Sequence, residues 1–298
     1  MIKPNFFLVG APKCGTTTVY DWISQHPEVY MSENKEPHFF YSPHKSSQSF
    51  DQYLDNFSEA EGGGYKIIGE ASVWYLFSES AAEKIINFNP LSKFIVCLRN
   101  PLEMAPSLHA QLVYNGHELE KKFDAAWALS EKRENGVPVK VFDLSGGDVT
   151  HMSYRKACML GSQVNSLLKA VPRESVLFIF IDDLKNDPGS VWRDIKSFLD
   201  IDNGFVCSFE KKNSATARRS VIFNILVVFL NKIKKKVGVK YNFGFSTFLK
   251  KVNTVDKIYD KPGDSTIEMM RCEFELELVL LESLVGRLPS GWKHAKVD

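Results

Sequence analysis

The 298-residue sequence lacks an apolar run long enough to cross a lipid bilayer, which takes roughly 20 residues. The apolar decamer Val221–Leu230 is only half that long. The chain also has almost no net charge, +1 at pH 7, so it has no overall electrostatic attraction to nucleic acid. Its first residues lead straight into a strand-like segment without the composition of a signal peptide. We therefore expect no transmembrane segment, no nucleic-acid partner and a cytoplasmic location.

Cysteine is scarce and scattered. The cysteines are odd in number and widely spaced, which fits neither a disulfide framework nor the paired ligands of a structural zinc site. We therefore expect reduced thiols, as in a cytoplasmic protein. The five residues are Cys14, Cys97, Cys158, Cys207 and Cys272.

The most informative absence lies near the N-terminus, where the apolar run Phe6–Val9 leads through a glycine-bounded loop into a helical pattern. The loop Gly10–Thr18 offers backbone N–H groups and the positive end of a helix dipole, which together bind anions. It lacks a lysine directly after its second glycine, Gly15, where nucleoside-triphosphate P-loops need one. Its only lysine, Lys13, lies inside the loop. The sequence predicts an anion site that is poorly suited to a magnesium-bound triphosphate.

Short apolar runs alternate with helical patterns along the chain, which predicts an α/β fold with a doubly wound parallel sheet. Asn100 and Asp187 each precede a proline and are typical helix caps. In such a sheet, ligands bind beyond the carboxyl ends of the strands. The expected strands are Phe6–Val9, Tyr65–Gly69, Lys93–Leu98 and Ser175–Ile181, and the expected helices are Thr16–Gln25, Ser80–Phe88, Pro101–Tyr114 and Tyr154–Ala170.

Three stretches interrupt this alternation. Residues 41–64 and 131–152 are polar and glycine-containing, so we expect them to be surface insertions that carry substrate specificity. The third is the apolar decamer Val221–Leu230, which is followed by lysines up to Lys236. It predicts a buried helix or a lid over the substrate, within a helical C-terminal region at 220–298. Peripheral contact with a membrane surface is the less favoured alternative.

A second candidate anion site follows the expected strand Lys93–Leu98. Arg99 leaves this strand at the predicted ligand-binding edge, followed by Pro101, and Ser107 comes two helical turns later. A guanidinium group and a hydroxyl in this arrangement can hold a phosphate. Because a single arginine after a buried strand is usually just a surface residue, the prediction gains its weight from being paired with the first loop.

Together, the two segments resemble the phosphosulfate-binding elements of sulfotransferases that use 3′-phosphoadenylyl sulfate (PAPS). The resemblance implies one sulfotransferase domain over residues 1–298, with a three-layer α/β/α, P-loop NTPase-like fold around a central parallel sheet. It also explains the first loop, because PAPS carries two separate anionic groups and has no γ-phosphate for a lysine and magnesium. The implied donor is therefore PAPS, without a metal. The implied PAPS-binding residues are Lys13, Cys14, Gly15, Thr16, Thr17, Thr18, Arg99, Ser107, Arg218 and Arg219.

The resemblance continues across most of the chain. Residues 69–75 are similar to the second-strand segment of the family, residues 177–184 to its acidic strand end, and residues 212–219 to its late basic loop. Leu284–Trp292 resembles its leucine-rich C-terminal helix followed by Gly-Trp. The segment Lys35–Phe40, with the sequence Lys-Glu-Pro-His-Phe-Phe, is similar to that of the heparan sulfate sulfotransferases and their bacterial relatives. One departure is Met104, which stands where relatives often have a second arginine.

The same resemblance assigns roles to individual residues. Glu36 is expected to be the general base for the acceptor, and Lys13 is expected to neutralise charge on the bridging oxygen of PAPS. His38 is the third expected catalytic residue: it is expected to orient the substrate, and it is the rival candidate for the base, because the small-molecule sulfotransferases use a histidine. Glu70 and Ser72 are expected to contact the substrate. Two other histidines, His26 and His109, are expected to be structural.

Two other functions remain open at this stage. One is a P-loop-type nucleotide kinase or NTPase, because Asp182 and Asp183 imitate the acidic end of a magnesium-binding strand. The other is a non-catalytic nucleotide-binding protein of the same fold. For a sulfotransferase, the expected acceptor is a hydroxyl or amine of a carbohydrate or a small molecule. The sequence indicates no oligomeric state.

Overall fold

The computed structural model describes residues 2–41, 49–134, 149–209, 216–218, 254–256 and 260–292. By their internal contacts, the residues divide into two units. Unit 1 comprises residues 1–104, 159–212 and 271–298, and unit 2 comprises residues 105–158 and 213–270.

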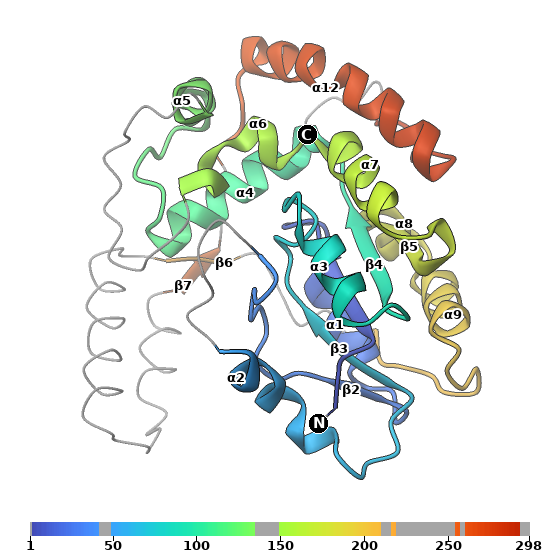
Figure 1. The fold of residues 1–298 in the computed structure, drawn as a ribbon. Helices are drawn as coiled ribbons and strands as arrows, with labels where there is room; N and C mark the ends of the chain where they lie inside the picture. Colours follow the sequence, from blue (N-terminus) through green and yellow to red (C-terminus); the bar gives the residue numbers. More distant parts are fainter. Residues whose placement is uncertain are drawn as a thin grey trace, which may run out of the picture. The chain divides into compact units, whose positions relative to one another are not determined.

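Unit 1 is built on a sheet of five parallel strands in the order β2-β3-β1-β4-β5 (Figure 1). The central strand β1 is buried at every position, as expected for a continuous apolar run that is covered on both faces. The strands are β1 (Phe6–Gly10), β2 (Val29–Met31), β3 (Ile67–Ala71), β4 (Lys93–Leu98) and β5 (Val176–Phe180).

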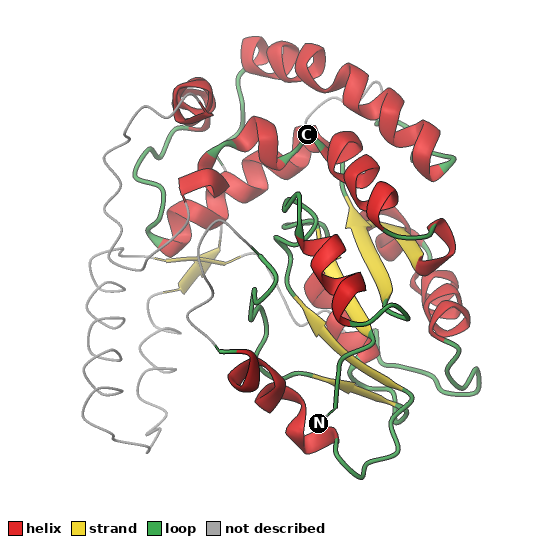
Figure 2. Ribbon diagram, in the orientation of Figure 1, coloured by secondary structure: helices red, strands yellow, loops and turns green. Residues whose placement is uncertain are grey.

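The strand order decides which face of the sheet each helix covers. The chain passes from β1 to β2 in one direction across the sheet and from β3 to β4 in the other. Because such crossovers are right-handed, α1 (Thr16–Ile23) and α3 (Ala81–Phe88) cover opposite faces (Figure 2). Helix α7 (Leu160–Ala170) contacts α3. The predicted α/β fold with a central parallel sheet is confirmed.

The boundaries of several elements differ from the prediction. The strand Lys93–Leu98 is confirmed residue for residue, but β3 lies two residues later than expected, which brings Glu70 into the strand. Strand β2 was not predicted, because three residues are too few for a periodic signal. The helix expected at Tyr154–Ala170 is two helices, α6 (Tyr154–Ala157) and α7, because Met159 leaves helical geometry with ψ of 68°.

The C-terminal helix also lies earlier than expected. Helix α12 runs from Asp264 to Val285, so only the first two residues of the predicted segment Leu284–Trp292 are helical. Gly286 ends the helix, since it adopts the left-handed region with φ of 92° and its N–H bonds the carbonyl of Glu282.

The expected insertion over residues 41–64 is not simply surface, as its described part shows. Ser49 and Gln52 form a capping box that starts α2 (Phe50–Leu54), and a 3₁₀ turn follows at Asp55–Ala60. The side chain of Tyr53 is fully buried. That this segment and residues 131–152 are insertions stays a prediction.

Helices α8 (Ile181–Asn186) and α9 (Pro188–Leu199), with a 3₁₀ turn at Arg173–Ser175, complete unit 1. The carboxylate of Asp187 accepts from the N–H of Ser190, so the predicted cap before Pro188 is confirmed. His26 is structural, as expected: its ring is buried and bonds the backbone at Asp202 and Glu28.

Unit 2 contains most of helix α4 (Pro101–Asn115), together with α5, a 3₁₀ turn, α6 and a short antiparallel pair of strands. These elements are α5 (Phe123–Glu134), the turn Val149–Met152, β6 (Thr216–Arg218) and β7 (Thr254–Asp256). The apolar decamer 221–230 and its lysines lie outside the described residues. Among the helices that are described, none is long and apolar enough to span a membrane.

Candidate functional site

The first loop joins β1 to α1 at the carboxyl edge of the sheet, in unit 1. Gly15 caps α1 in the left-handed region with φ of 93°, and an added Cβ would lie 2.8 Å from Cδ1 of Leu184. Only glycine fits there. Helix geometry leaves the first N–H groups of α1, those of Thr16 and Thr17, without partners within the helix, whereas the N–H groups of Thr18 and Val19 bond the carbonyl of Gly15 at 3.0 and 3.2 Å. The structure therefore places a set of N–H donors where the sequence predicted an anion site.

Two loop residues differ in what they can offer a ligand. The thiol of Cys14 is fully buried, lies 3.7 Å from the sulfur of Met104, and has its pKa raised to about 12 by burial. Cys14 therefore contributes no thiolate, and its N–H already donates to the carbonyl of Ala11 at 3.3 Å. Lys13 is half-buried and adopts a positive φ of 66°. Met104, at the position where an arginine was expected in relatives, is buried and faces the loop from within.

Arg99 and Lys13 lie together at this edge. The Arg99 guanidinium donates to the carbonyl of Lys13 at 3.3 Å, and to one carboxylate oxygen of Glu103 at 2.9 and 3.1 Å. Burial lowers the pKa of Lys13, and the charge of Arg99 lowers it further, while Cys14 and Glu36 act in the opposite direction. A negative ligand that contacts both cations would relieve their mutual repulsion.

Glu36 and His38 face each other across a tight turn. Nε2 of His38 lies 3.2 Å from Oε2 of Glu36, and both side chains are about one-third exposed. Glu36 and His38 adopt positive φ values of 68° and 51°. Among the described non-glycine residues, the others with positive φ are Lys13 and Asp200, the latter at the end of α9. Left-handed backbone is uncommon for non-glycine residues, and Lys13, Glu36 and His38 all belong to the two segments in which the sequence predicted site residues.

Lys35 is a residue to which the sequence assigned no role. Its Nζ donates to the hydroxyl of Thr17 at 2.9 Å and lies 5.2 Å from the centre of the Tyr20 ring. Burial lowers its pKa, and the carboxylate of Glu36 opposes that shift. Glu36 therefore interacts electrostatically with both Lys13 and Lys35. The sequence gave one indication that Lys35 belongs to the site, because Lys35 lies in the same six-residue segment as Glu36.

Glu70 and Ser72, which were expected to contact the acceptor, are buried in unit 1. Both side chains have no exposed surface. Glu70 accepts hydrogen bonds from the hydroxyls of Ser72, Tyr53 and Tyr75, at 2.7, 2.7 and 2.9 Å. Burial raises the pKa of Glu70, and these three bonds oppose that shift. Glu70 lies in strand β3, which extends further than predicted, and Ser72 follows its end; both side chains lie inside unit 1, and their contact with an acceptor stays a prediction.

The acidic pair at the end of β5 is engaged by the C-terminal segment. The indole N–H of Trp292 donates to Asp182 at 3.1 Å, and Arg287 forms an ion pair with Asp183. The Trp292 ring also packs edge-on against Phe180, with ring centres 5.3 Å apart. These two carboxylates therefore bond the C-terminal segment at Arg287 and Trp292, and each is engaged by a different partner.

Unit 2 contains Ser107 and His109. Ser107 is buried, and its hydroxyl has no hydrogen-bond partner among the described residues. Since Arg99 belongs to unit 1, its pairing with Ser107 stays a prediction. Nε2 of His109 bonds the carbonyl of Glu120 at 2.8 Å, and burial lowers the pKa of the imidazole. Its role is structural, as expected. Arg218 lies in β6, while Arg219 lies outside the described residues.

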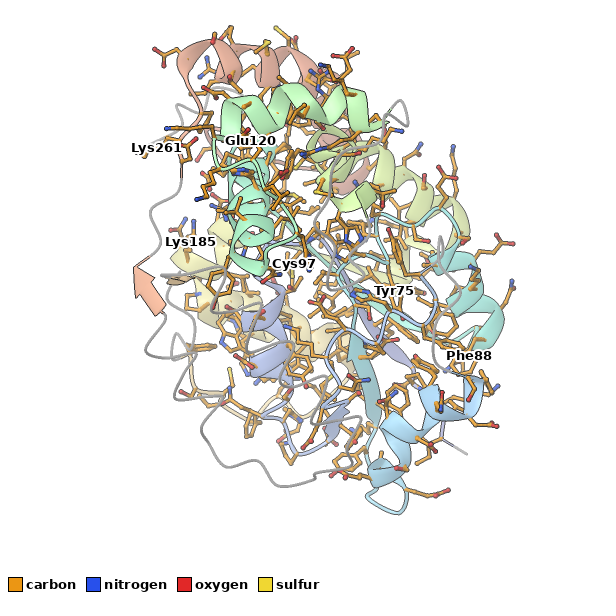
Figure 3. All side chains as sticks on the ribbon, turned by 90° about the vertical axis from the view of Figure 1, so that its left-hand side faces the viewer. Tyr75, Phe88, Cys97, Glu120, Lys185 and Lys261 are labelled. Carbon is orange, nitrogen blue, oxygen red and sulfur yellow. The ribbon has the colours of Figure 1, made fainter. Side chains whose placement is uncertain are left out.

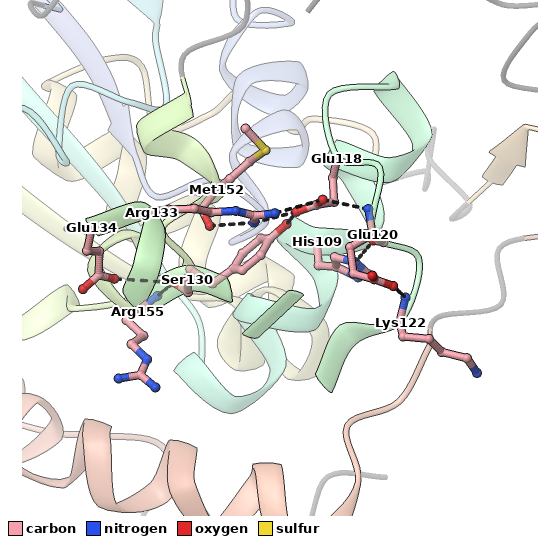
Figure 4. A network of polar contacts seen from close by, with 10 residues as sticks. His109, Glu118, Glu120, Lys122, Ser130, Arg133, Glu134, Met152 and Arg155 are labelled. Atoms are coloured by element: carbon pink, nitrogen blue, oxygen red, sulfur yellow. Dashed lines mark hydrogen bonds and ion pairs between the residues drawn. The ribbon is translucent and has the colours of Figure 1, made fainter. Parts of the chain in front are cut away.

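A buried ion pair in unit 2 connects helices α5 and α6 through Glu118. Arg133 and Glu118 are almost fully buried and form two hydrogen bonds, at 2.6 and 3.1 Å (Figure 4). The Tyr154 hydroxyl donates to the same carboxylate at 2.8 Å. Burial alone would raise the pKa of Glu118, but its bonds with Arg133 hold it below its ordinary value.

Comparison with known proteins decides the family. A family model described as "Sulfotransferase domain" matches residues 3–222, which include the first loop, Glu36 and Arg99. The chain belongs to the sulfotransferase family. Within this family, the chain is 30% identical to mouse carbohydrate sulfotransferase 15 over 143 residues. This alignment covers 34% of the chain and 26% of the mouse protein.

Two further similarities support this membership. The human bifunctional heparan sulfate N-deacetylase/N-sulfotransferase 2 is 23% identical over 207 residues, covering 66% of the chain and 22% of that protein. The chain thus matches about a quarter of the length of these curated relatives. The solved sulfotransferase from Alicyclobacillus acidocaldarius has a TM-score of 0.72 and 24% identity, covering 99% of this chain and 100% of that one. The sulfotransferase fold predicted from the sequence is confirmed.

Proposed function

We propose that the chain transfers a sulfuryl group from PAPS to a hydroxyl or amine of a carbohydrate or small-molecule acceptor. The observation that carries this proposal is the gathering of Lys13, Arg99 and Glu36, from three separate segments, at the carboxyl edge of one sheet. The carbohydrate class is favoured first, because the names of the relatives cited above specify carbohydrate and heparan sulfate.

The proposed reaction needs a base and a stabilised leaving group. The carboxylate of Glu36 removes the proton from the acceptor as its oxygen or nitrogen attacks sulfur. The bond between sulfur and the bridging oxygen breaks, leaving 3′-phosphoadenosine 5′-phosphate (PAP). Lys13 stabilises the charge that develops on that oxygen. His38 orients Glu36 through their 3.2 Å contact.

The predicted residues bind different parts of the donor. N–H groups from Gly15 to Thr17 and the Thr16 and Thr17 hydroxyls hold the 5′-phosphosulfate, and Arg99 holds the 3′-phosphate. The expected parts of Thr18 and Ser107 in donor binding remain predictions. No step requires a metal. Arg218, Arg219 and the cytoplasmic location remain predictions.

The kinase alternative is less favoured by the site. A triphosphate enzyme needs a lysine at the position of Thr16 and a carboxylate free to act on magnesium. Asp182 and Asp183 are instead bonded to Trp292 and Arg287. No observation specifically supports a non-catalytic protein.

The test combines donor binding with transfer. PAP in the presence of EDTA should raise the melting temperature, because a ligand that binds only the native state stabilises it. Radiolabelled PAPS is then incubated with a panel of heparan and chondroitin oligosaccharides, phenols and amines. Transfer should be lost in Lys13→Ala and kept in Lys84→Ala, which removes an exposed lysine on α3. Stabilisation by ATP with magnesium but not by PAP would contradict the proposal.

A further inference from the structure

Glu70 is a buried carboxylate that the proposed reaction does not use. It lies on β3, one residue before the strand ends, and has no exposed surface. Three hydroxyls donate to it: those of Tyr53 and Tyr75 to Oε1, and that of Ser72 to Oε2. A buried carboxylate is costly unless it is fully hydrogen-bonded, so a purely structural position would be filled more easily by an apolar side chain.

Two of these hydroxyls also contact the turn that carries Glu36 and His38. The Ser72 hydroxyl accepts from the N–H of His38 at 3.1 Å, and the Tyr75 hydroxyl accepts from the N–H of Phe40 at 3.2 Å. Tyr75, labelled in Figure 3, is almost fully buried. The N–H of Glu36 donates to the carbonyl of Ala71, next to Glu70 in the strand.

The direction of these bonds follows from proton count. A hydroxyl has a single proton, so once Ser72 and Tyr75 donate theirs to Glu70, only their lone pairs remain for the turn. Those lone pairs can only accept hydrogen bonds, and the donors present are the N–H groups of His38 and Phe40. A hydrogen-bond acceptor at position 70 therefore orients both hydroxyls so that they accept hydrogen bonds from the backbone N–H groups of the turn.

We propose that Glu70 is a positioning residue: by orienting the Ser72 and Tyr75 hydroxyls, it holds the Glu36–Phe40 turn in its positive-φ conformation, with Glu36 ready to act as the base. This inference rests on the proposed function for its catalytic consequence. The holding of the turn itself does not depend on that function.

The structure supplies a matched pair of variants for the test. Tyr53 and Tyr75 are both buried and both donate to the same oxygen of Glu70. Among the described residues, the Tyr53 hydroxyl bonds Glu70 alone, whereas the Tyr75 hydroxyl also accepts a hydrogen bond from the N–H of Phe40. Tyr53→Phe and Tyr75→Phe thus each remove one hydrogen bond to the same oxygen of Glu70, and only Tyr75→Phe also removes a bond to the turn.

Amide hydrogen exchange of the full chain, read on the peptide that covers residues 35–41, tests the holding directly. Losing one hydrogen bond should speed exchange of the turn amides by about 3- to 10-fold in Tyr75→Phe and in Ser72→Ala, and Glu70→Gln should speed it to a similar degree because the carboxamide no longer accepts from both hydroxyls. Tyr53→Phe should leave exchange of this peptide within about twofold of wild type, while lowering the melting temperature to a similar degree. Equal exchange in Tyr53→Phe and Tyr75→Phe would overturn the proposal.

Transfer kinetics separate this proposal from the proposed function. With an acceptor found in the PAPS panel, Tyr75→Phe, Ser72→Ala and Glu70→Gln should lower kcat by about tenfold or more with PAP affinity unchanged, since only the base is misplaced. Tyr53→Phe should keep kcat. If wild-type protein transfers nothing from PAPS, the proposed function fails and hydrogen exchange still decides the role of Glu70. If exchange rises but kcat does not, the catalytic part of this proposal is overturned.

Discussion

Replacing Arg99 by alanine is the sharpest test of donor binding. The guanidinium lies at the edge of the sheet with about one-fifth of its side chain exposed, and its donors bond Glu103 and the carbonyl of Lys13. A hydrogen bond to a charged group contributes about 1.5–3 kcal/mol, which corresponds to a loss of about 10- to 150-fold in PAP affinity. Part of the bonding capacity of Arg99 is already taken by Glu103, so we expect the lower half of that range.

Two further variants separate the contributions of Arg99. Arg99→Lys keeps the positive charge but loses the planar fork, so it should recover only part of the affinity. Glu103→Gln keeps Arg99 and removes its competing carboxylate, so PAP should bind as well as or better than in wild type. The partly exposed Arg99–Glu103 pair joins the end of β4 to the first turn of α4, so its loss should cost only about 0.2–1 kcal/mol of stability.

Isothermal titration calorimetry with PAP in EDTA measures these differences, and a thermal melt of each variant checks its fold. The reasoning would be refuted by an Arg99→Ala protein that melts like wild type and binds PAP within about twofold of it. Salt gives a second check, because screening should weaken wild-type binding more than that of Arg99→Ala.

Three other changes have defined outcomes. Glu36→Gln should abolish transfer while PAP affinity stays nearly unchanged; an active Gln variant would exclude Glu36 as the base. Gly15→Ala should destabilise the protein by at least about 1–2 kcal/mol in urea unfolding, because it strains a left-handed residue and meets Leu184; adding Leu184→Ala should relieve only the steric part. Arg133→Met should cost about 3–5 kcal/mol at pH 7 by leaving the Glu118 carboxylate buried and unpaired, and a loss below about 1 kcal/mol would contradict this. Because the ion pair lowers the pKa of Glu118 in the folded state, the stabilisation that the pair contributes is present at neutral pH and is lost as pH falls through that lowered value. Urea unfolding near pH 4 should therefore show a smaller difference in stability between wild type and Arg133→Met.

Local signals made the frame of the sheet predictable. Strand β4 was predicted residue for residue because it is one apolar run that ends at a capped helix entrance, Asn100-Pro101, and the Asn100 carboxamide does accept from Leu102. Strand β3 was predicted two residues too early. Its polar end contains Glu70, and a buried charge inside a strand gives no hydrophobic signal.

The candidate site was predictable in its residues but not in its contacts. Lys13, Glu36 and Arg99 were chosen from local segments and their resemblance to a family, and the structure brings them to one edge of unit 1. The sequence did not indicate that Lys35 donates to Thr17, 18 residues away. It also gave no reason to expect Glu70 inside unit 1, beneath the turn.

The sequence by itself determined the anion loop, the parallel strands and the identity of the charged residues, because these depend on glycine geometry, apolar runs and caps within a few residues of one another. Only the tertiary structure decided which charges face one another and which are buried. Asp182 and Asp183 resemble metal ligands in the sequence, yet they bond Trp292 and Arg287, more than 100 residues away. Pairings over such distances depend on the packing of whole elements, which no short segment encodes.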